Sequence, residues 1–344
     1  MPIFSKEILR GVTAAIFRAT GAPADLALQV AEVLVDNHMA GHDSHGILRI
    51  PEYIRSVQAG EIDPTARPRI LEESATSALV SGNWAFGQVT GNFAADLAIE
   101  KAKRERVVVL SVVQAGHTGR LAAFTERAAR RGVVMFMAIG TVNKPTTAPY
   151  GGSAPVLGTN PIAFSIPNPA GPPVTLDFAT STIAAGKIKA AKARHEQLPS
   201  GAIMDKEGRP TTDPQAFFEG GFLLPFGGHK GYALAVIAEL LSGPLAGADA
   251  YPGITSRSGI FVFAMDAAVF RPQADYARAL SRTLGRIKAV PPGPGFDEVL
   301  LPGEPEARSR AKRESDGISI PEETWKAVCA VGAELGVDVE KEII

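Results

Sequence analysis

Two long apolar runs constrain the fold of this chain more than any other feature of its sequence. Residues 107–113 and 133–139 are almost entirely apolar, and many of them are β-branched. A strand that meets water on one face alternates apolar and polar side chains, so these runs predict strands covered on both faces. A Gly116-His117-Thr118-Gly119 turn and a predicted helix that ends near residue 131 lie between them. The segment therefore predicts a buried unit of strand, glycine turn, helix and strand.

This unit has the order of a dinucleotide-binding βαβ unit but lacks the usual fingerprint. The Rossmann signature needs Gly-x-Gly-x-x-Gly in the turn and an acidic residue at the end of the next strand. Here the turn contains Gly116 and Gly119, and the second strand ends Gly140-Thr141-Val142-Asn143 without a carboxylate. One interpretation survives, in which free backbone N–H groups at the helix start near Gly119 hold a phosphate.

The flanking segments predict helices at the N-terminus and several further short elements. Residues 5–40 have the periodicity of two amphipathic helices. Ser5 is expected to cap the first helix, Pro23 to lie in the first turn of the second helix, and Gly41 to end that second helix. The remaining predicted helices are 51–58, 89–106, 228–241 and one from about Ser319, where Ser319 and Glu322 suggest a capping box. The remaining predicted strands are 77–80, 162–166, 174–178 and 260–265, and residues 291–306 predict a crossing loop.

Composition narrows the class of protein. With 344 residues, 45% of them hydrophobic and 21% charged, the chain predicts a folded protein of two or three subdomains. A formal net charge of −1 argues against a nucleic-acid partner. The lone Cys329 permits no internal disulfide, and the sequence has no signal-peptide pattern and no apolar stretch near the roughly 20 residues of a membrane span. We therefore expect a cytoplasmic protein with no membrane partner.

Three histidines near the end of the second helix allow two kinds of chemistry. His38, His42 and His45 are spaced by four and three residues, and Asp43 lies between them, which suits a metal-dependent hydrolase. Gly41 is expected to end the helix, however, so the spacing need not place these side chains on one face. We expect no metal site.

The segment Asp43-Ser44-His45-Gly46 is more suggestive of acid–base catalysis. A histidine titrates near neutral pH and can exchange a proton with a carbonyl or hydroxyl oxygen. Arg49 follows four residues later and could hold a substrate carboxylate from the same helical face. The alternative, in which His45 caps a helix and Arg49 is a surface charge, is equally compatible with the local sequence.

Three further segments have groups that could contact an anionic ligand. Asp177 ends a predicted strand and precedes Thr180 and Lys187, although it could equally cap a helix. Residues 158–161 form a polar turn, and residues 227–231 open a helix with glycines, His229 and Lys230. Residue chemistry alone predicts an enzyme with an anionic ligand and goes no further.

Taken together, these segments resemble the malate/L-lactate dehydrogenase family of oxidoreductases that lack a Rossmann fold. The resemblance runs from Asp43-Ser44-His45-Gly46 to Leu301-Pro302-Gly303-Glu304. Between them lie four more ordered motifs, at residues 157–161, 176–181, 210–214 and 224–232. The family includes ureidoglycolate, sulfolactate and diketogulonate enzymes and a cyclic-imine reductase.

The resemblance implies an α+β, sulfolactate-dehydrogenase-like fold in three domains, assembled as a homodimer. A helical subdomain would comprise residues 1–65, joined by C-terminal helices at about 305–344. A mostly antiparallel sheet domain would comprise residues 66–110 and 235–300, and an α/β cofactor-binding domain residues 111–234. The implied function is transfer of a hydride between NAD or NADP and a small 2-oxo or 2-hydroxy acid.

The resemblance also implies roles for individual residues. His45 would exchange the proton with support from Ser44 and Asp177, while Arg49 would hold the substrate carboxylate. We expect His117 and Thr159 to contact the substrate as well. The cofactor site would comprise His117, Gly119, Arg120, Leu121, Ala122, Asn160, Asp177, Phe178, Ala179, Thr180, Lys187, His229, Lys230, Gly231, Gly303 and Glu304.

Several choices stay open. Family members often have a small polar residue before the histidine that matches His117, whereas this chain has Gln114-Ala115-Gly116, so its substrate preference stays open. A cyclic imine 2-carboxylate would fit His45 and Arg49 as well as a 2-oxo acid does. The basic residues Lys187, Lys189, Lys192 and Arg194 could meet the 2′-phosphate of NADP or could form a solvated helix face. A binding protein without catalysis is the remaining alternative.

Overall fold

The computed structural model describes residues 1–141, 145–193, 195–248 and 258–343. The α-helices and short 3-10 helices of these residues are α1 (Lys6–Ala19), α2 (Ala24–Met39), η1 (Asp43–His45), η2 (Ile47–Arg49), α3 (Ile50–Gln58), α4 (Gly87–Glu105), α5 (Ala122–Arg130), α6 (Ala185–Ala193), α7 (Pro214–Phe218), α8 (His229–Ser242), α9 (Gln273–Lys288), α10 (Glu304–Asp316), α11 (Glu322–Glu334) and η4 (Lys341–Ile343). Across these ranges, each helix is too short or too polar to cross a membrane.

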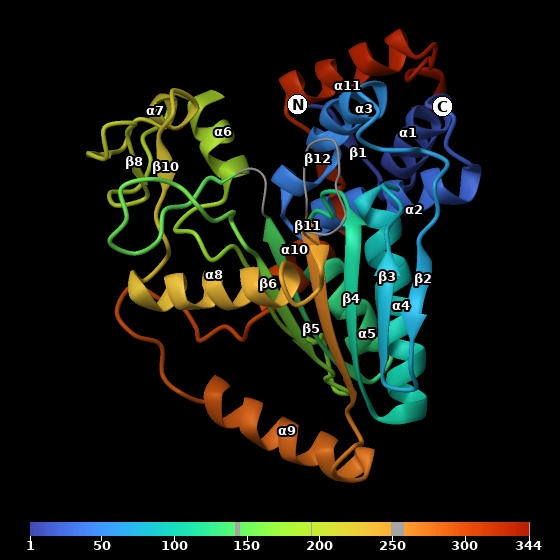
Figure 1. Cartoon of the computed structure of the whole chain (residues 1–344), viewed down its shortest axis with the longest axis vertical. Helices are drawn as coiled ribbons and strands as arrows, with labels where there is room; N and C mark the ends of the chain where they lie inside the picture. The colour runs from blue at the N-terminus through green and yellow to red at the C-terminus, as the bar shows by residue number, and fades with distance from the viewer. Residues whose placement is uncertain (142–144, 194, 249–257, 344) are drawn as a thin grey trace.

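A mixed sheet runs through the centre of the molecule (Figure 1). Within the described residues its seven strands lie in the order β2 (Arg69–Glu73), β3 (Ser77–Ser81), β4 (Val107–Ala115), β11 (Ser258–Asp266), β5 (Val133–Thr141), β6 (Ile162–Ile166) and β7 (Val174–Phe178). Neighbouring strands are antiparallel, apart from the parallel pair β3 and β4. The fold is α+β, as predicted.

The two apolar runs form β4 and β5, but another strand separates them. β11 is antiparallel to both, and its Ile260 lies opposite Val112 of β4 and Ile139 of β5. β4 and β5 therefore point the same way without bonding to each other. In a dinucleotide-binding βαβ unit the two parallel strands are hydrogen-bonded neighbours, whereas here β11 lies between them.

Helices cover the two faces of the sheet unequally. α4 and α5 pack against one face through small side chains such as Ala98 and Ala128, which let the helices approach the strands closely. α8 crosses the opposite face, where Ala238 packs with Ala138 and Ile162 (Figure 1). Much of that second face lacks a helix above it within the described residues.

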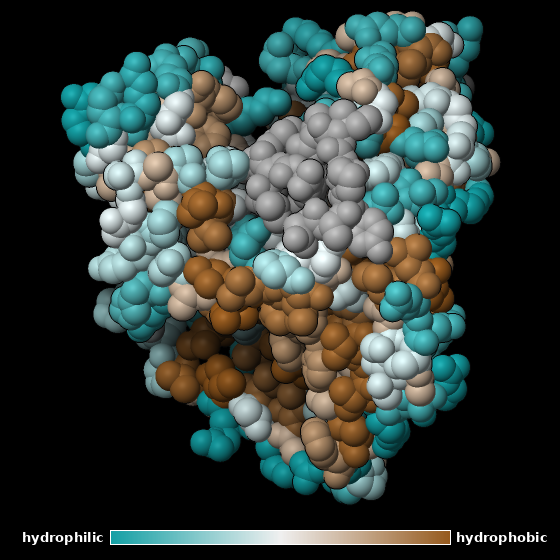
Figure 2. All heavy atoms as spheres, in the orientation of Figure 1, coloured by the Kyte–Doolittle hydropathy of each residue, from teal (hydrophilic) through white to brown (hydrophobic). Residues whose placement is uncertain are grey.

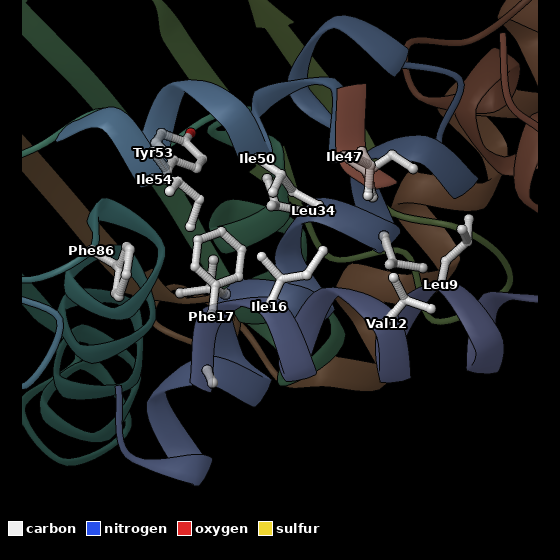
Figure 3. Close-up of a cluster of buried hydrophobic side chains, with 14 of the residues drawn as sticks. Leu9, Val12, Ile16, Phe17, Leu34, Ile47, Ile50, Tyr53, Ile54 and Phe86 are labelled. Atoms are coloured by element: carbon white, nitrogen blue, oxygen red, sulfur yellow. The ribbon is translucent and has the colours of Figure 1, made fainter. Parts of the chain in front are cut away.

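A helical layer lies above one end of the sheet, near both chain ends (Figure 1). Figure 3 shows its core, in which Phe17 of α1, Leu34 of α2 and Ile54 of α3 point toward one another. Phe86 joins from the start of α4, with its ring 5.2 Å from that of Phe17. The C-terminal helix α11 packs on this core, and β1 (Ile3–Phe4) pairs with β12 (Ile318–Ser319). Residues from both ends of the chain thus share one core.

Residues 182–193 and 195–224 form a smaller unit to one side, which we call the outer lobe (Figure 1, upper left). It contains α6, α7 and a small sheet of β8 (Ile203–Met204), β9 (Pro210–Thr211) and β10 (Phe222–Leu223). Its buried core is built around Ile188, Leu198 and Leu223. The central sheet takes strands from residues predicted for the sheet domain and for the cofactor-binding domain, so the three-domain division stays a prediction.

Local signals at helix ends gave mixed results. The Ser5 cap is confirmed, because the Ile8 amide donates to its hydroxyl at 3.2 Å. The predicted capping box is wrong, because Ser319 lies in β12 opposite Ile3 and α11 starts behind Pro321. The predicted crossing loop is shorter than expected because α10 begins at Glu304, and α9 had no sequence prediction.

Candidate active site

Two short turns after α2 place the predicted acid–base residue. Asn37 donates from Nδ2 to the carbonyl oxygen of His45 at 2.9 Å, which ties the turn to the end of α2. Arg49 donates from Nε to the carbonyl oxygen of Ser44 at 2.8 Å. A single helical face for His45 and Arg49 is not formed, because Gly46 separates η1 from η2. The Arg49 side chain instead folds back onto the backbone beside His45.

Glycine is required at position 46 by the histidine behind it. A Cβ atom on Gly46 would lie 2.2 Å from Cδ2 of His38, closer than two such atoms can approach. His38 is buried, and its Nδ1 lies 2.9 Å from a carboxylate oxygen of Asp43. Arg313 of α10 also bonds Asp43, so the turn is fixed from both sides. These hydrogen bonds keep the pKa of the Asp43 carboxyl well below its usual range, although burial opposes them.

Two histidine rings meet at the centre of the site. The rings of His45 and His117 are nearly parallel, 20° apart, with centroids separated by 5.9 Å. Nδ1 of His45 lies 3.0 Å from the Ser44 hydroxyl. Nδ1 of His117 lies 2.7 Å from the Tyr53 hydroxyl, which Gln88 also contacts from its Nε2 at 2.9 Å. We call residues 37–53 together with His117 the inner wall of the site.

Both imidazoles are neutral near pH 7. Burial, together with the neighbouring His117 and Arg49, lowers the pKa of His45 to about 3. Burial also lowers the pKa of His117, and the charge of Arg49 acts in the same direction. His117 as a residue is nevertheless exposed to solvent, although its Nδ1 faces the buried Tyr53. A neutral imidazole can accept a proton or donate a hydrogen bond.

Arg49 lies in the wall of a cavity of about 170 Å³ between the inner wall and the outer lobe. Its Nη1 donates to Glu52 at 2.6 Å, and its side chain is mostly buried. Among the described residues, no hydrogen-bond acceptor engages Nη2. The outer-lobe side of this cavity includes Lys189, Phe217 and Phe218.

Gly186 of α6 separates this cavity from a larger one. A Cβ atom there would lie 3.0 Å from Cβ of Ser44 and 3.6 Å from Nη2 of Arg49, so the outer lobe approaches the inner wall closely at this glycine. The larger cavity has a volume of about 470 Å³. Its polar lining includes His42, Asp43, Ser44, Lys187, Glu196 and Gln197.

One amide at the start of α5, where a phosphate was one interpretation of the sequence, already has a partner. The Ala122 amide donates to a carboxylate oxygen of Asp177 at 2.8 Å, so a carboxylate from β7 already occupies this helix end. Arg120 is buried beside it, with Nε 3.9 Å from Asp177 and an ion pair to Glu126. Burial raises the pKa of Asp177 to about 6, against the opposing effect of Arg120. Asp177 contacts this network, and no hydrogen bond within the described residues joins it to His45.

The other predicted cofactor residues are spread over several parts of the fold. Thr180 donates from its hydroxyl to the carbonyl oxygens of Thr159 and Asn160, at 3.1 and 3.0 Å, which locks two motifs together. His229 and Lys230 are exposed at the start of α8, and Gly231 packs against Phe226, whose ring meets that of Phe178. Leu121 is buried in the sheet core, whereas Ala179 and Gly119 are partly accessible. Gly303 precedes α10, and Glu304 accepts from the Leu301 amide and from Lys288.

The three clustered histidines have separate partners. His38 contacts Asp43, His42 lies 3.2 Å from Glu306, and His45 contacts Ser44 and His117. The described part of the chain brings no group of three or more histidine, cysteine, aspartate or glutamate residues into position to hold a metal. The arrangement gives the metal-dependent hydrolase no support.

Sequence reasoning missed the residues that contact the site from a distance along the chain. Tyr53 and Gln88 meet His117, and Phe217 and Phe218 line the small cavity from the outer lobe. Tyr53 follows Arg49 by four residues on α3, which was the one available signal. The outer-lobe residues have no local motif that distinguishes them from ordinary core positions.

Comparison with known proteins agrees over nearly the whole chain. The family model described as malate/L-lactate dehydrogenase matches residues 4–329. The L-sulfolactate dehydrogenase of Methanocaldococcus jannaschii is 36% identical over 95% of this chain and 96% of its own length.

Two solved structures extend the comparison to three dimensions. A putative malate/lactate dehydrogenase from E. coli superposes with a TM-score of 0.92 at 31% identity, covering 99% of this chain and 98% of that one. The Δ1-piperideine-2-carboxylate reductase of Pseudomonas syringae pv. tomato gives a TM-score of 0.84 at 31% identity, covering 96% of this chain and 100% of that one.

Proposed function

The chain belongs to the malate/L-lactate dehydrogenase family, and from that premise we propose that it transfers a hydride between a nicotinamide cofactor and C2 of a small 2-oxo or 2-hydroxy acid. One observation carries the proposal. A neutral imidazole, His45, and the partly engaged guanidinium of Arg49 lie on the same wall, beside cavities at the junction with the outer lobe. This is the pair of groups that a 2-hydroxy acid requires, one for its hydroxyl proton and one for its carboxylate.

Arg49 would hold the substrate carboxylate. Its Nε is occupied by Ser44 and its Nη1 by Glu52, so the first hydrogen bond would come from Nη2. A bidentate pair would require Glu52 to release Nη1, which is feasible because the Glu52 side chain is 43% exposed. The small cavity suits an acid of a few carbon atoms, because about 170 Å³ leaves little room for a larger one.

His45 would exchange the proton at the C2 oxygen. Because its pKa is low in the free protein, it is ready to accept a proton when a hydroxy acid is oxidised. In the direction of reduction the ring must be protonated, and an anionic substrate would raise its pKa by offsetting the charge of Arg49. Ser44 would orient the ring through Nδ1.

The larger cavity has one cationic residue that would hold an anionic nucleotide. Lys187 lines it together with Ser44 and Gln197, whereas Asp43 and Glu196 add acidic groups, of which Asp43 is paired with Arg313. Gly186 adds no side chain between this cavity and Arg49. A nicotinamide bound here supplies or takes the hydride. Of the basic run, Lys189 lines the other cavity, Lys192 lies over the Phe218 ring at 4.6 Å, and Arg194 lies outside the described residues. Lys187 is therefore our candidate contact for a cofactor phosphate.

The first experiment follows the loss of reduced-nicotinamide absorbance. Purified protein would be mixed with NADH or NADPH and with pyruvate, oxaloacetate or a cyclic imine 2-carboxylate. Oxidation with a 2-oxo acid would support the proposal and reveal the preferred cofactor. Turnover with the imine alone would favour the second candidate function, that of a cyclic-imine reductase. The likeness to the piperideine-2-carboxylate reductase is the reason for testing this candidate. Failure of every acceptor would contradict both.

We also propose that two copies of the chain associate through the apolar face. We define this face as Phe136, Phe164 and Phe261 of the sheet with Leu234, Ile237 and Leu240 of α8. Figure 2 shows apolar side chains gathered over these elements, and Ile237 is 53% exposed. Exposed apolar patches of this kind mark protein interfaces, and the resemblance to a dimeric family names a second copy as the occupant.

The mass in solution tests the dimer. Light scattering should give twice the 36.1 kDa of one chain, and Ile237→Asp should shift the population toward monomer. Leu28→Asp, on an exposed position of α2, is the matched control and should leave the mass unchanged. A monomer for the unmodified chain would contradict the proposal.

A further inference from the structure

A short chain of buried hydrogen bonds lies behind the histidine pair. Gln88 of α4 contacts the Tyr53 hydroxyl, and Tyr53 contacts Nδ1 of His117. Gln88 and Tyr53 are 1% and 2% exposed, so water does not compete for these bonds. Figure 3 shows the Tyr53 ring within the helical core with its hydroxyl at the edge of that core.

The direction of the first bond follows from the groups around Gln88. Its Nε2 faces the carbonyl oxygens of His117 and Thr118, each at 3.4 Å, as well as the Tyr53 hydroxyl at 2.9 Å. Carbonyl oxygens only accept hydrogen bonds, so the amide nitrogen and not the amide oxygen belongs on this side. Gln88 therefore donates to the oxygen of Tyr53.

The direction of the second bond follows from the first. Burial raises the pKa of the Tyr53 hydroxyl, so its proton stays in place. That proton has one acceptor among the described residues, Nδ1 of His117 at 2.7 Å. A buried hydroxyl proton without an acceptor would cost roughly 1–3 kcal/mol, which favours donation to the ring. Nδ1 must then be unprotonated, and the neutral ring has its proton on Nε2.

We propose that Gln88 and Tyr53 are positioning residues that fix His117 as the Nε2–H tautomer, so that His117 donates a hydrogen bond to the C2 oxygen of the substrate. The edge of His117 that contains Nδ1 is turned toward the buried Tyr53, so the solvent-facing side of the ring is the one that can present Nε2. The identity of the acceptor rests on the proposed function. The tautomer does not, because it is a property of the free protein.

The proposal explains how two adjacent imidazoles can have different tasks. His45 faces the Ser44 hydroxyl, which can donate or accept and so tolerates a change in protonation at Nδ1. His117 faces a hydroxyl whose only available role is donation, so protonation of its Nδ1 would leave two donors opposed. His45 is therefore free to exchange a proton, whereas His117 is held as a fixed donor.

Nitrogen NMR of histidine-labelled protein tests the tautomer directly. The ¹⁵N shifts of a neutral imidazole distinguish the protonated nitrogen from the bare one, and His117→Gln identifies the His117 signals by their loss. We expect a bare Nδ1 and a protonated Nε2 in the unmodified, full-length protein. A protonated Nδ1 would overturn the proposal without any measurement of activity.

Two variants test the relay itself. Tyr53→Phe keeps the ring in the core but removes the donor, and we expect the His117 signals to report a mixture of tautomers. Turnover should fall about 10- to 100-fold. This decrease is smaller than the roughly 10⁴-fold decrease seen when a catalytic histidine is held wholly in the wrong tautomer. Gln88→Met should act in the same direction with a smaller effect. It also keeps the test open if Tyr53→Phe does not fold.

The control removes a tyrosine hydroxyl elsewhere. Tyr276→Phe loses a hydrogen bond to the Pro167 carbonyl, at 2.6 Å, and should change neither the His117 signals nor turnover. Unchanged His117 signals in Tyr53→Phe would overturn the relay. If the expected tautomer is found but no acid or imine is reduced, the proposed function fails and the fixed tautomer survives. If the protein reduces 2-oxo acids while His117 has its proton on Nδ1, the relay fails alone.

Discussion

The two sides of the site differ in how firmly they are built. The inner wall stands on the helical core, where Leu34, Ile50 and Phe17 are fully buried. The outer lobe has a small core of its own, around Ile188 and Leu198, and meets the inner wall at Gly186. The residues proposed for proton transfer and carboxylate binding all lie on the inner wall, which is the side supported by the larger core. The difference suggests that the inner wall sets the reaction, whereas the outer lobe sets which acid is admitted.

The charges are divided in the same way. On the inner wall, Asp43 is held by His38 and Arg313, and His42 faces Glu306. On the outer lobe, Lys187 and Lys189 are exposed at the two cavities. The paired ionic groups of the inner wall fix the positions of its side chains. The exposed cations of the outer lobe can attract an anionic ligand.

The largest expected effect comes from the inner wall. His45→Ala should lower kcat by about 10²–10⁴, the usual range for a positioned acid–base group. His195→Ala, which removes an exposed histidine that lines neither cavity, is the matched control and should retain most of the activity. Steady-state kinetics with the preferred acceptor decides the matter, and near-normal turnover of His45→Ala would remove that residue from its role.

The difference in firmness can be measured as stability. Leu34→Ala, at a fully buried position of the helical core, should lower the free energy of unfolding by about 2–5 kcal/mol. Leu198→Ala removes the same atoms from the outer lobe and should cost less, because a small core near the surface relaxes more easily. Denaturant titration of both variants compares the two regions. An equal or larger loss for Leu198→Ala would break the comparison.

Carboxylate binding should be the next largest effect. Arg49→Lys should raise the KM for the acid about 10- to 100-fold, because a lysine loses the planar fork and a charge-assisted hydrogen bond of roughly 1.5–3 kcal/mol. The effect on kcat should be small if substrate positioning survives. Initial rates over a range of acid concentrations separate the two constants, and an unchanged KM would contradict the assignment.

The outer lobe should affect preference more than rate. Phe218→Ala widens the small cavity and removes the ring beneath Lys192, a contact worth about 0.5–1 kcal/mol at an exposed site. We expect a several-fold shift of kcat/KM toward bulkier 2-oxo acids, with little loss of stability. Competition between a short and a branched 2-oxo acid measures the shift. A uniform loss with both acids would place Phe218 outside the selection of substrate.

The smallest effect is expected from acid pH. Because the pKa of His45 is lowered to about 3, the basic form persists well below the range of an ordinary histidine. We expect kcat/KM for oxidation of a hydroxy acid to change by less than about twofold between about pH 7.5 and about pH 5.5. A histidine with an ordinary pKa near 6.5 would lose about tenfold over that interval. Such a loss would show that the free site does not hold His45 neutral.

Sequence patterns predicted the elements whose signal is local. The apolar runs of β4 and β5, the Ser5 cap and the turn around His45 all depend on residues that are close together along the chain. The family resemblance was confirmed, whereas the site residues that it implies stay predictions. Ser319 misled because the strand pairing with Ile3 replaced the helix cap. The occupant of the α5 end, Asp177, could not be predicted, because it comes from a strand 55 residues further on.

The position of β11 has a consequence for synthesis of the protein on the ribosome. β4 and β5 are complete by residue 141, but the strand that lies between them ends at residue 266. While the intervening segment is translated, β4 and β5 each have one edge without the partner strand β11. Unpaired edges of apolar strands promote aggregation. We expect nascent chains halted before residue 258 to require a chaperone, and chains released beyond residue 266 to close the sheet at once.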